Sequence, residues 1–115
     1  MIGNNNNLSG LLNYLQGDAN NVLGNQNSVL GDLNKILGTS NGLIGSGNGA
    51  IGNFNGIVGN ANLAIGNANG IFGNLNSVQG NANGVYGNLN FVQGNTNGIY
   101  GNKNYVSGSG NTVRS

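Results

Sequence analysis

The stretch that decides the fold is Gly73-Asn74-Leu75-Asn76-Ser77-Val78-Gln79-Gly80-Asn81-Ala82-Asn83-Gly84-Val85-Tyr86. It contains two heptads of the form Gly-Asn-x-Asn-x-(Val/Ile/Leu)-x, and the pattern runs from residue 3 to residue 114 without an insertion. We number the glycine as position one. Position one is Gly and position four is Asn in all sixteen heptads, and position six is always aliphatic. An unbroken repeat of this kind indicates one repeat domain, residues 1–115.

A seven-residue period is also typical of coiled coils, but this repeat does not fit them. Coiled coils need two apolar positions per heptad and good helix formers. Here only position six is regularly aliphatic, and each Gly costs about 1 kcal/mol in a helix interior. Sixteen such glycines exclude a helix. Aliphatic, mostly β-branched residues between turn formers instead predict a short strand around position six and a corner at Gly-Asn-x-Asn.

The variable positions indicate how many heptads make one coil. From residue 42 to residue 98, position five is Gly in every second heptad, a period of 14 residues, and varies in the heptads between. The glycines are Gly42, Gly56, Gly70, Gly84 and Gly98, and the residues between them are Gly49, Leu63, Ser77, Phe91 and Tyr105. A 21-residue, three-sided coil would mix the two sets. A hairpin meander built on the six Asn-Gly dipeptides is disfavoured, because the same position also holds Phe91.

We therefore predict an all-β fold, a two-sided parallel β-solenoid (β-roll) of eight 14-residue coils with two parallel sheets back to back. Position six should point inward and form two facing aliphatic columns, one from each sheet. Position four lies two residues earlier on the same side of the strand, so its Asn should also point inward. Buried amides need partners, and stacked amides about 4.8 Å apart can bond from coil to coil. The predicted ladder residues are Asn6, Asn13, Asn20, Asn27, Asn34, Asn41, Asn48, Asn55, Asn62, Asn69, Asn76, Asn83, Asn90, Asn97, Asn104 and Asn111. The invariant Gly at position one should supply a left-handed or crowded corner.

Composition excludes most chemical functions. The chain has no Cys and no His, two Asp and no Glu, and a net charge of +1. We therefore expect no zinc site, no nucleophile pair, no catalytic residues and no cofactor, and hence no enzyme. Three cations cannot neutralise a run of phosphates, so no nucleic-acid binding is expected, and no apolar run is long enough for a membrane helix. Asp18 and Asp32 stack at one corner, where we interpret them as solvated carboxylates and expect no metal.

The repeats Asn76-Ser77-Val78-Gln79-Gly80 and Asn83-Gly84-Val85-Tyr86-Gly87 resemble the Asn-x-Val-x-Gly motif of the grass ice-binding, ice-recrystallisation-inhibition β-rolls. The resemblance covers residues 3–114. It implies coils of 14 to 15 residues, an inward valine column, internal Asn ladders and a flat ice-binding face. In that family the ice face is built from outward Thr, Ser and Val at positions five and seven, where this chain carries mostly glycines, aromatic residues and aliphatic residues.

These outward positions predict the surfaces for lateral contact. One face should carry the glycines of position five as a trough beside a ridge at position seven, formed by Ile44, Val58, Phe72, Tyr86 and Tyr100. The opposite face carries Leu63, Phe91 and Tyr105, which could fill such a trough in a neighbouring molecule.

The predicted function is therefore self-assembly. The repeat occupies the chain from end to end, and neither terminal coil shows a polar cap, so both edges should accept further strands. We expect a structural protein whose coils stack head-to-tail into an amyloid-like, cross-β filament, with itself as partner. No signal peptide is visible, and an extracellular or surface fibril is the favoured location. The alternative is an ice-binding protein that uses a flat solenoid face, with ice as its partner.

Overall fold

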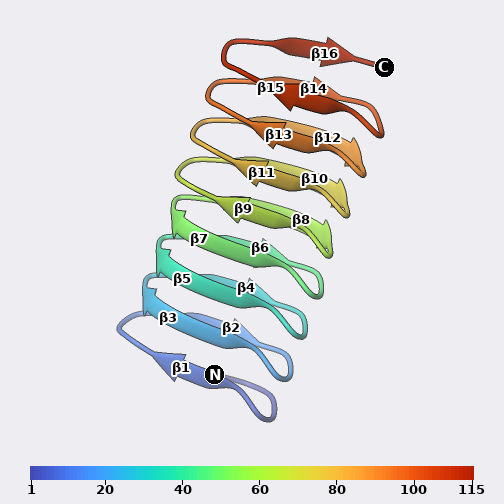
Figure 1. Ribbon diagram of the computed structural model, residues 1–115. Helices are drawn as coiled ribbons and strands as arrows, with labels where there is room; N and C mark the ends of the chain where they lie inside the picture. The colour runs from blue at the N-terminus through green and yellow to red at the C-terminus, as the bar shows by residue number, and fades with distance from the viewer.

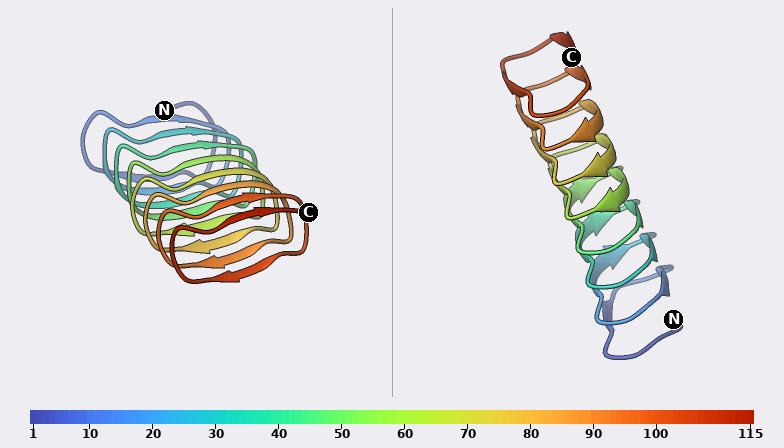
Figure 2. Two further views of the ribbon diagram at one scale, coloured as in Figure 1. Left: turned by 90° about the horizontal axis from the view of Figure 1, so that it is seen from above. Right: turned by 90° about the vertical axis from the view of Figure 1, so that its right-hand side faces the viewer.

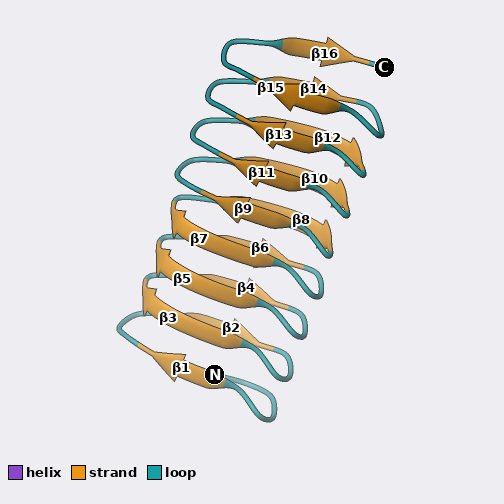
Figure 3. Cartoon of the chain, viewed as in Figure 1, coloured by secondary structure: helices purple, strands orange, loops and turns teal.

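The structure is a computed structural model that describes residues 1–115, and it consists of strands and turns without a helix (Figure 1 and Figure 3). Each strand has three to five residues and contains position six of one heptad. The strands are β1 (Asn7–Ser9), β2 (Tyr14–Gln16), β3 (Asn21–Asn25), β4 (Ser28–Leu30), β5 (Lys35–Thr39), β6 (Gly42–Ile44), β7 (Gly49–Asn53), β8 (Gly56–Asn60), β9 (Leu63–Ile65), β10 (Gly70–Asn74), β11 (Ser77–Gln79), β12 (Gly84–Asn88), β13 (Phe91–Gln93), β14 (Gly98–Tyr100), β15 (Tyr105–Ser107) and β16 (Thr112–Arg114).

The strands form two parallel eight-stranded sheets, one of the odd-numbered and one of the even-numbered strands. Each strand pairs with the strand two places along the chain, in a register of 14 residues, as in Ile71 with Val85 and Val78 with Val92. Figure 2 shows the coils from above as flattened rings stacked along one axis. The Cα trace measures 39 × 20 × 12 Å, close to the length expected for eight coils about 4.8 Å apart. The predicted solenoid with two strands per coil is confirmed.

The core is the pair of aliphatic columns that the repeat predicts. Fourteen position-six residues are buried, and the two in the outermost coils, Leu8 and Val113, pack against them partly exposed. Alternate residues of a strand point to opposite faces, so position six fills the narrow interior between the strands, and the position-four Asn residues lie inward at the corners. The small residues Ala50 and Ala64 lie side by side in one column and are fully buried.

The predicted ladders of position-four Asn are present, and they bond to the backbone as well as to one another. The Nδ2 of Asn76 donates to Oδ1 of Asn62 at 3.0 Å and to the carbonyl of Gly87 at 2.7 Å. Its own Oδ1 accepts from the backbone N–H and the Nδ2 of Asn90, at 3.0 and 3.1 Å. No buried side-chain polar atom lacks a partner, so these amides enter the interior without the penalty of an unmet hydrogen bond.

The crowded corner predicted at position one is confirmed, and it explains why Gly and Asn recur together. Gly73 has φ of +139°, and a Cβ built on it would lie 1.8 Å from the carbonyl oxygen of Gly87. This is the same carbonyl that accepts from Asn76 Nδ2. The coil above can therefore approach only where position one has no side chain. Asn76, in the same heptad as Gly73, then donates to the Gly87 carbonyl of that coil.

Two features of the corners were not predicted. Position three has positive φ in all sixteen heptads, near +60° even where it holds Leu75, Leu89 or Thr96. Position two forms a second, exposed ladder of opposite direction, in which the lower residue donates: Asn74 N–H and Nδ2 both reach Oδ1 of Asn88, at 2.9 and 3.2 Å.

Candidate functional site

The site with the most distinct shape is the outer face of the even-numbered sheet, which we call the glycine face. Its trough consists of the position-five glycines, Gly42, Gly56, Gly70, Gly84 and Gly98. Its ridge consists of the position-seven residues two places later, Ile44, Val58, Phe72, Tyr86 and Tyr100. Positions five and seven both point away from the buried position six, and the 14-residue register aligns each set in a straight row along the stack. The trough and the ridge predicted from the sequence therefore lie on one face, side by side.

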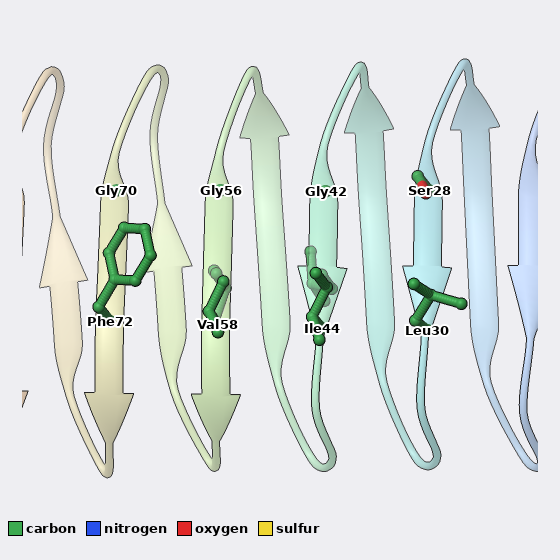
Figure 4. Close-up of a pocket in the computed structure, with 10 residues that line it drawn as sticks. Ser28, Leu30, Gly42, Ile44, Gly56, Val58, Gly70 and Phe72 are labelled. Carbon is green, nitrogen blue, oxygen red and sulfur yellow. The ribbon is translucent and has the colours of Figure 1, made fainter.

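The trough is open at its centre. A Cβ built on Gly42, Gly56, Gly70 or Gly84 would meet no atom within 4 Å. The open part forms a groove of about 260 Å³ from Ser28 to Phe72. Figure 4 shows Ser28 and three glycines in one row of the sheet and Leu30, Ile44, Val58 and Phe72 in the row beside it. The backbone of the glycines is the floor of this groove, and the ridge is its wall.

The ridge changes from aliphatic to aromatic along the stack. Phe72 and Tyr86 are stacked with ring centroids 4.9 Å apart, and Tyr86 and Tyr100 with centroids 5.2 Å apart. Arg114 continues the row, with its guanidinium 5.5 Å from the centre of the Tyr100 ring. Because each ring covers the face of the next, the row presents ring edges rather than open ring faces to solvent. The five ridge side chains are 37–51% exposed, an apolar strip with no partner within the chain.

The opposite face has an aliphatic row at position seven, formed by Leu23, Leu37, Ile51 and Ile65, but its position-five row is irregular. Phe91 stacks on Tyr105 at 5.1 Å, but Ser77 separates Phe91 from Leu63 in the same row. The Leu63 side chain lies over Gly49, where its Cδ1 would be 3.1 Å from an added Cβ. Gln79 and Gln93 bond to each other at 3.0 Å in the neighbouring row. This face is therefore mixed in polarity, and its predicted contact residues are divided into two groups.

Charge is almost absent from the glycine face. Among the charged residues only Arg114 lies in one of its outward positions, while Lys35 belongs to the opposite sheet and Lys103 to a corner. Asp18 and Asp32 lie at position two, where each uses Oδ1 to accept the backbone N–H of the coil below at 2.7 Å. No group of three or more potential metal-ligating side chains occurs.

No protein-family model matches this chain, and no curated protein resembles it at a significant level. The chain also contains no helix able to cross a membrane.

The sequence did not indicate the full form of this site. The row of glycines and the row of bulky residues follow from the 14-residue period. The stacking of the rings and the opening between Ser28 and Phe72 depend on the distance between coils and on side-chain rotamers. The change from aliphatic to aromatic residues at Phe72 was a visible signal that the two halves of the ridge differ.

Proposed function

We propose that this protein is a structural, self-assembling protein, without enzymatic activity, whose coils stack head-to-tail into cross-β filaments. The observation that carries the proposal is that consecutive coils are equivalent: each bonds to the next with the same groups at the same 14-residue spacing. The upper edge of a coil is therefore complementary to the lower edge of any other coil, including one in a second chain.

Each coil makes the bonds that such stacking needs in both directions. From the coil below, the position-five N–H donates upward to a position-four carbonyl, as in Gly84 to Asn97 at 2.8 Å. From the coil above, the position-three N–H donates downward, as in Leu89 to Asn74 at 3.0 Å. The inner and outer Asn ladders run in opposite directions. A stacked chain would thus be bonded at its strands, at both inner ladders and at the outer ladder through Asn4, whereas Leu11 offers no side-chain acceptor at the other corner.

The contact between stacked chains would be heterologous, because the top of one coil meets the bottom of another. Because the second chain is related to the first by a translation along the coil axis, this contact does not close into a ring. It propagates as an open filament. Electrostatic repulsion between chains opposes this stacking only weakly, because each chain has five charged residues and a net charge of +1. A fibril outside the cell or on its surface remains the favoured setting.

Diffraction and growth measurements on the 115-residue chain test the proposal. Aligned filaments should show a meridional reflection near 4.8 Å with the coil axis along the fibre. In the lower coils, the position-five N–H donates to a carbonyl of the coil above. The equivalent N–H groups of Tyr105 and Thr112 therefore point away from the stack and have no backbone acceptor in the chain. Replacing both residues with Pro removes donors that only an added coil would use, so elongation should stop while the fold remains.

The control replaces Tyr105 and Thr112 with Ala, which retains both N–H groups, and this variant should still elongate. A parent chain that stays monomeric at high concentration would contradict the filament and favour the alternative of ice binding. In that case the monomer should shape ice crystals into facets. The unequal side chains and the groove of the glycine face support the filament over a flat ice-binding face.

A further inference from the structure

We infer that the glycine face binds the same face of a second copy, with the two coil axes parallel, so that the ridge of each copy enters the trough of the other. This inference rests on the proposed function and names the lateral partner within the filament. The occupant of the groove is therefore a second copy of this chain.

The direction of the pairing follows from symmetry. The ridge and the trough lie two residues apart along each strand, on either side of the buried position six. A twofold rotation about an axis parallel to the coil axis turns the two faces toward each other and exchanges left and right. Ridge then meets trough twice, at equal heights. The other twofold, which reverses the coil axis, would place ridge against ridge and leave both troughs empty.

The dimensions of the two rows match in the parallel arrangement. The ridge residues and the trough glycines come from the same five strands, β6, β8, β10, β12 and β14. At equal heights, Ile44 and Val58 of one copy face Gly42 and Gly56 of the other, where added side-chain atoms meet nothing within 4 Å. Further along, the stacked rings of Phe72, Tyr86 and Tyr100 face Gly70, Gly84 and Gly98 of the other copy. No stagger between the copies is needed.

The available area is that of a stable interface. The 39 Å length and 20 Å width of the solenoid set an upper limit for this face close to the ~800 Å² that each partner buries in a standard protein interface, and the ridge and the trough occupy five of its eight strands. Its centre is apolar and uncharged, and Arg114 lies at one end of the ridge. This is the distribution expected of an interface, with an apolar core and charge confined to the rim.

The opposite face and a polysaccharide fit the groove less well. On the opposite face the aliphatic row from Leu23 to Ile65 lies beside Lys35 and Leu63 rather than beside a row of open glycines, and Leu63 covers Gly49. A sugar would stack on an open aromatic face, but the ridge rings cover one another. The parallel pairing also gives both filaments the same polarity, so that the two solenoids can lengthen together from the same end.

A single substitution in the trough tests the inference. Gly56→Lys places a long charged side chain where Val58 of the second copy would enter, at a site where the fold has room for it. The matched control is Ser77→Lys, the same heptad position on the opposite face, where Lys35 already occurs. Both variants should keep the far-UV circular dichroism spectrum of the parent chain.

The readouts are filament width by cryo-EM and dimerisation by sedimentation equilibrium of chains whose axial growth is blocked with Pro at 105 and 112. Gly56→Lys should give single solenoids and weaken dimerisation at least about tenfold, whereas Ser77→Lys should behave as the parent. Paired filaments that persist in Gly56→Lys, or pairing lost only in Ser77→Lys, would overturn the inference. If no filament forms in any chain, the proposed function fails, while sedimentation still decides the lateral contact.

Cross-linking tests the direction of the pair, because the parent chain has no Cys. A short bifunctional maleimide, able to span the ~10 Å between packed sheets, is added to equimolar mixtures of growth-blocked single-Cys chains. Parallel axes should cross-link Gly42→Cys to Ile44→Cys, which then lie at the same height. Reversed axes would instead cross-link Ile44→Cys to Tyr100→Cys, at opposite ends of the ridge, and that result would overturn the inference.

Discussion

Glycine has two different roles in this repeat, and single substitutions separate them. At position one, Gly73 has positive φ and no room for a Cβ beside the Gly87 carbonyl. At position five, Gly70 has open space beside it. We predict that Gly73→Ala lowers the free energy of unfolding by at least about 3 kcal/mol, because it combines strain with a backbone clash. Gly70→Ala should be neutral or stabilise by up to about 1 kcal/mol. Urea unfolding of the two variants measures the difference, and equal effects would contradict this division.

Position three holds residues in a left-handed conformation that only Gly, Asn and Asp adopt readily. Thr96, which is β-branched, has φ of +59°. We predict that Thr96→Gly stabilises the fold by about 1 kcal/mol, because it relieves this strain. The same change at Thr39, in position two of another heptad and without positive φ, should destabilise by about 0.5–1 kcal/mol. Opposite shifts in the urea midpoint are the expected result, and a loss of stability in Thr96→Gly would show that the corner is not strained.

At the scale of the elements, the coils are held together by an inner and an outer Asn ladder that contribute unequally to the free energy of unfolding. Asn76 is 2% exposed, and its side chain takes part in four coil-to-coil hydrogen bonds. Asn74, in the outer ladder, is exposed. We predict that Asn76→Ala costs about 3 kcal/mol or more, because the Gly87 carbonyl and the Asn90 N–H lose their buried partner. Asn74→Ala should cost less than about 1 kcal/mol, since water can replace its bonds.

Hydrogen exchange gives an independent measurement of the inner ladder. In Asn76→Ala, exchange should accelerate most for the amides of the coil that contains Asn90, the residue whose N–H bonds to Asn76. Asn74→Ala should leave those amides protected. Equal costs for the two alanine variants would mean that burial does not separate the inner ladder from the outer one.

At the scale of the whole molecule, the ridge is expected to control bundling without controlling the fold. Phe72, Tyr86 and Tyr100 lie outside the buried columns, so replacing all three with Ser should leave the spectrum and the coil spacing unchanged. Bundling, measured as filament width by electron microscopy, should decrease. The control is Phe91→Ser with Tyr105→Ser on the opposite face. If that pair weakens bundling as strongly, the opposite face fills the trough.

Assembly should also depend little on salt. Five charged residues with a net charge of +1 leave few long-range interactions for ions to screen. We predict that the rate of elongation changes less than about twofold between low salt and 0.5 M salt, where screening is nearly complete. Light scattering at several salt concentrations measures this rate. A strong salt dependence would point to a contact through Arg114 or the Asp18 and Asp32 corner.

The sequence by itself determined the parts of this protein that depend on period alone. A repeat of seven with an alternation of 14 predicts the coil, the two sheets and the register. One aliphatic residue per heptad predicts the two columns, and the Asn two places earlier predicts the inner ladder. Even the trough and the ridge follow, because residues 14 apart must lie above one another once the coils stack. The structure confirms each of these features. They could be predicted because they depend only on the spacing of residue types along the chain.

The tertiary structure alone decided what depends on the distance between neighbouring coils. The positive φ at Leu75 and Thr96 runs against their intrinsic preference, and it is imposed by a corner that must close in the same way in every coil. The direction of the outer ladder depends on which side of its coil the Asn74 amide faces. The stacking of Phe72 on Tyr86 and the open groove beside Gly56 likewise arise only when side chains meet at the coil spacing. Local propensity cannot predict these features, because each is a contact between residues that the chain brings together by folding.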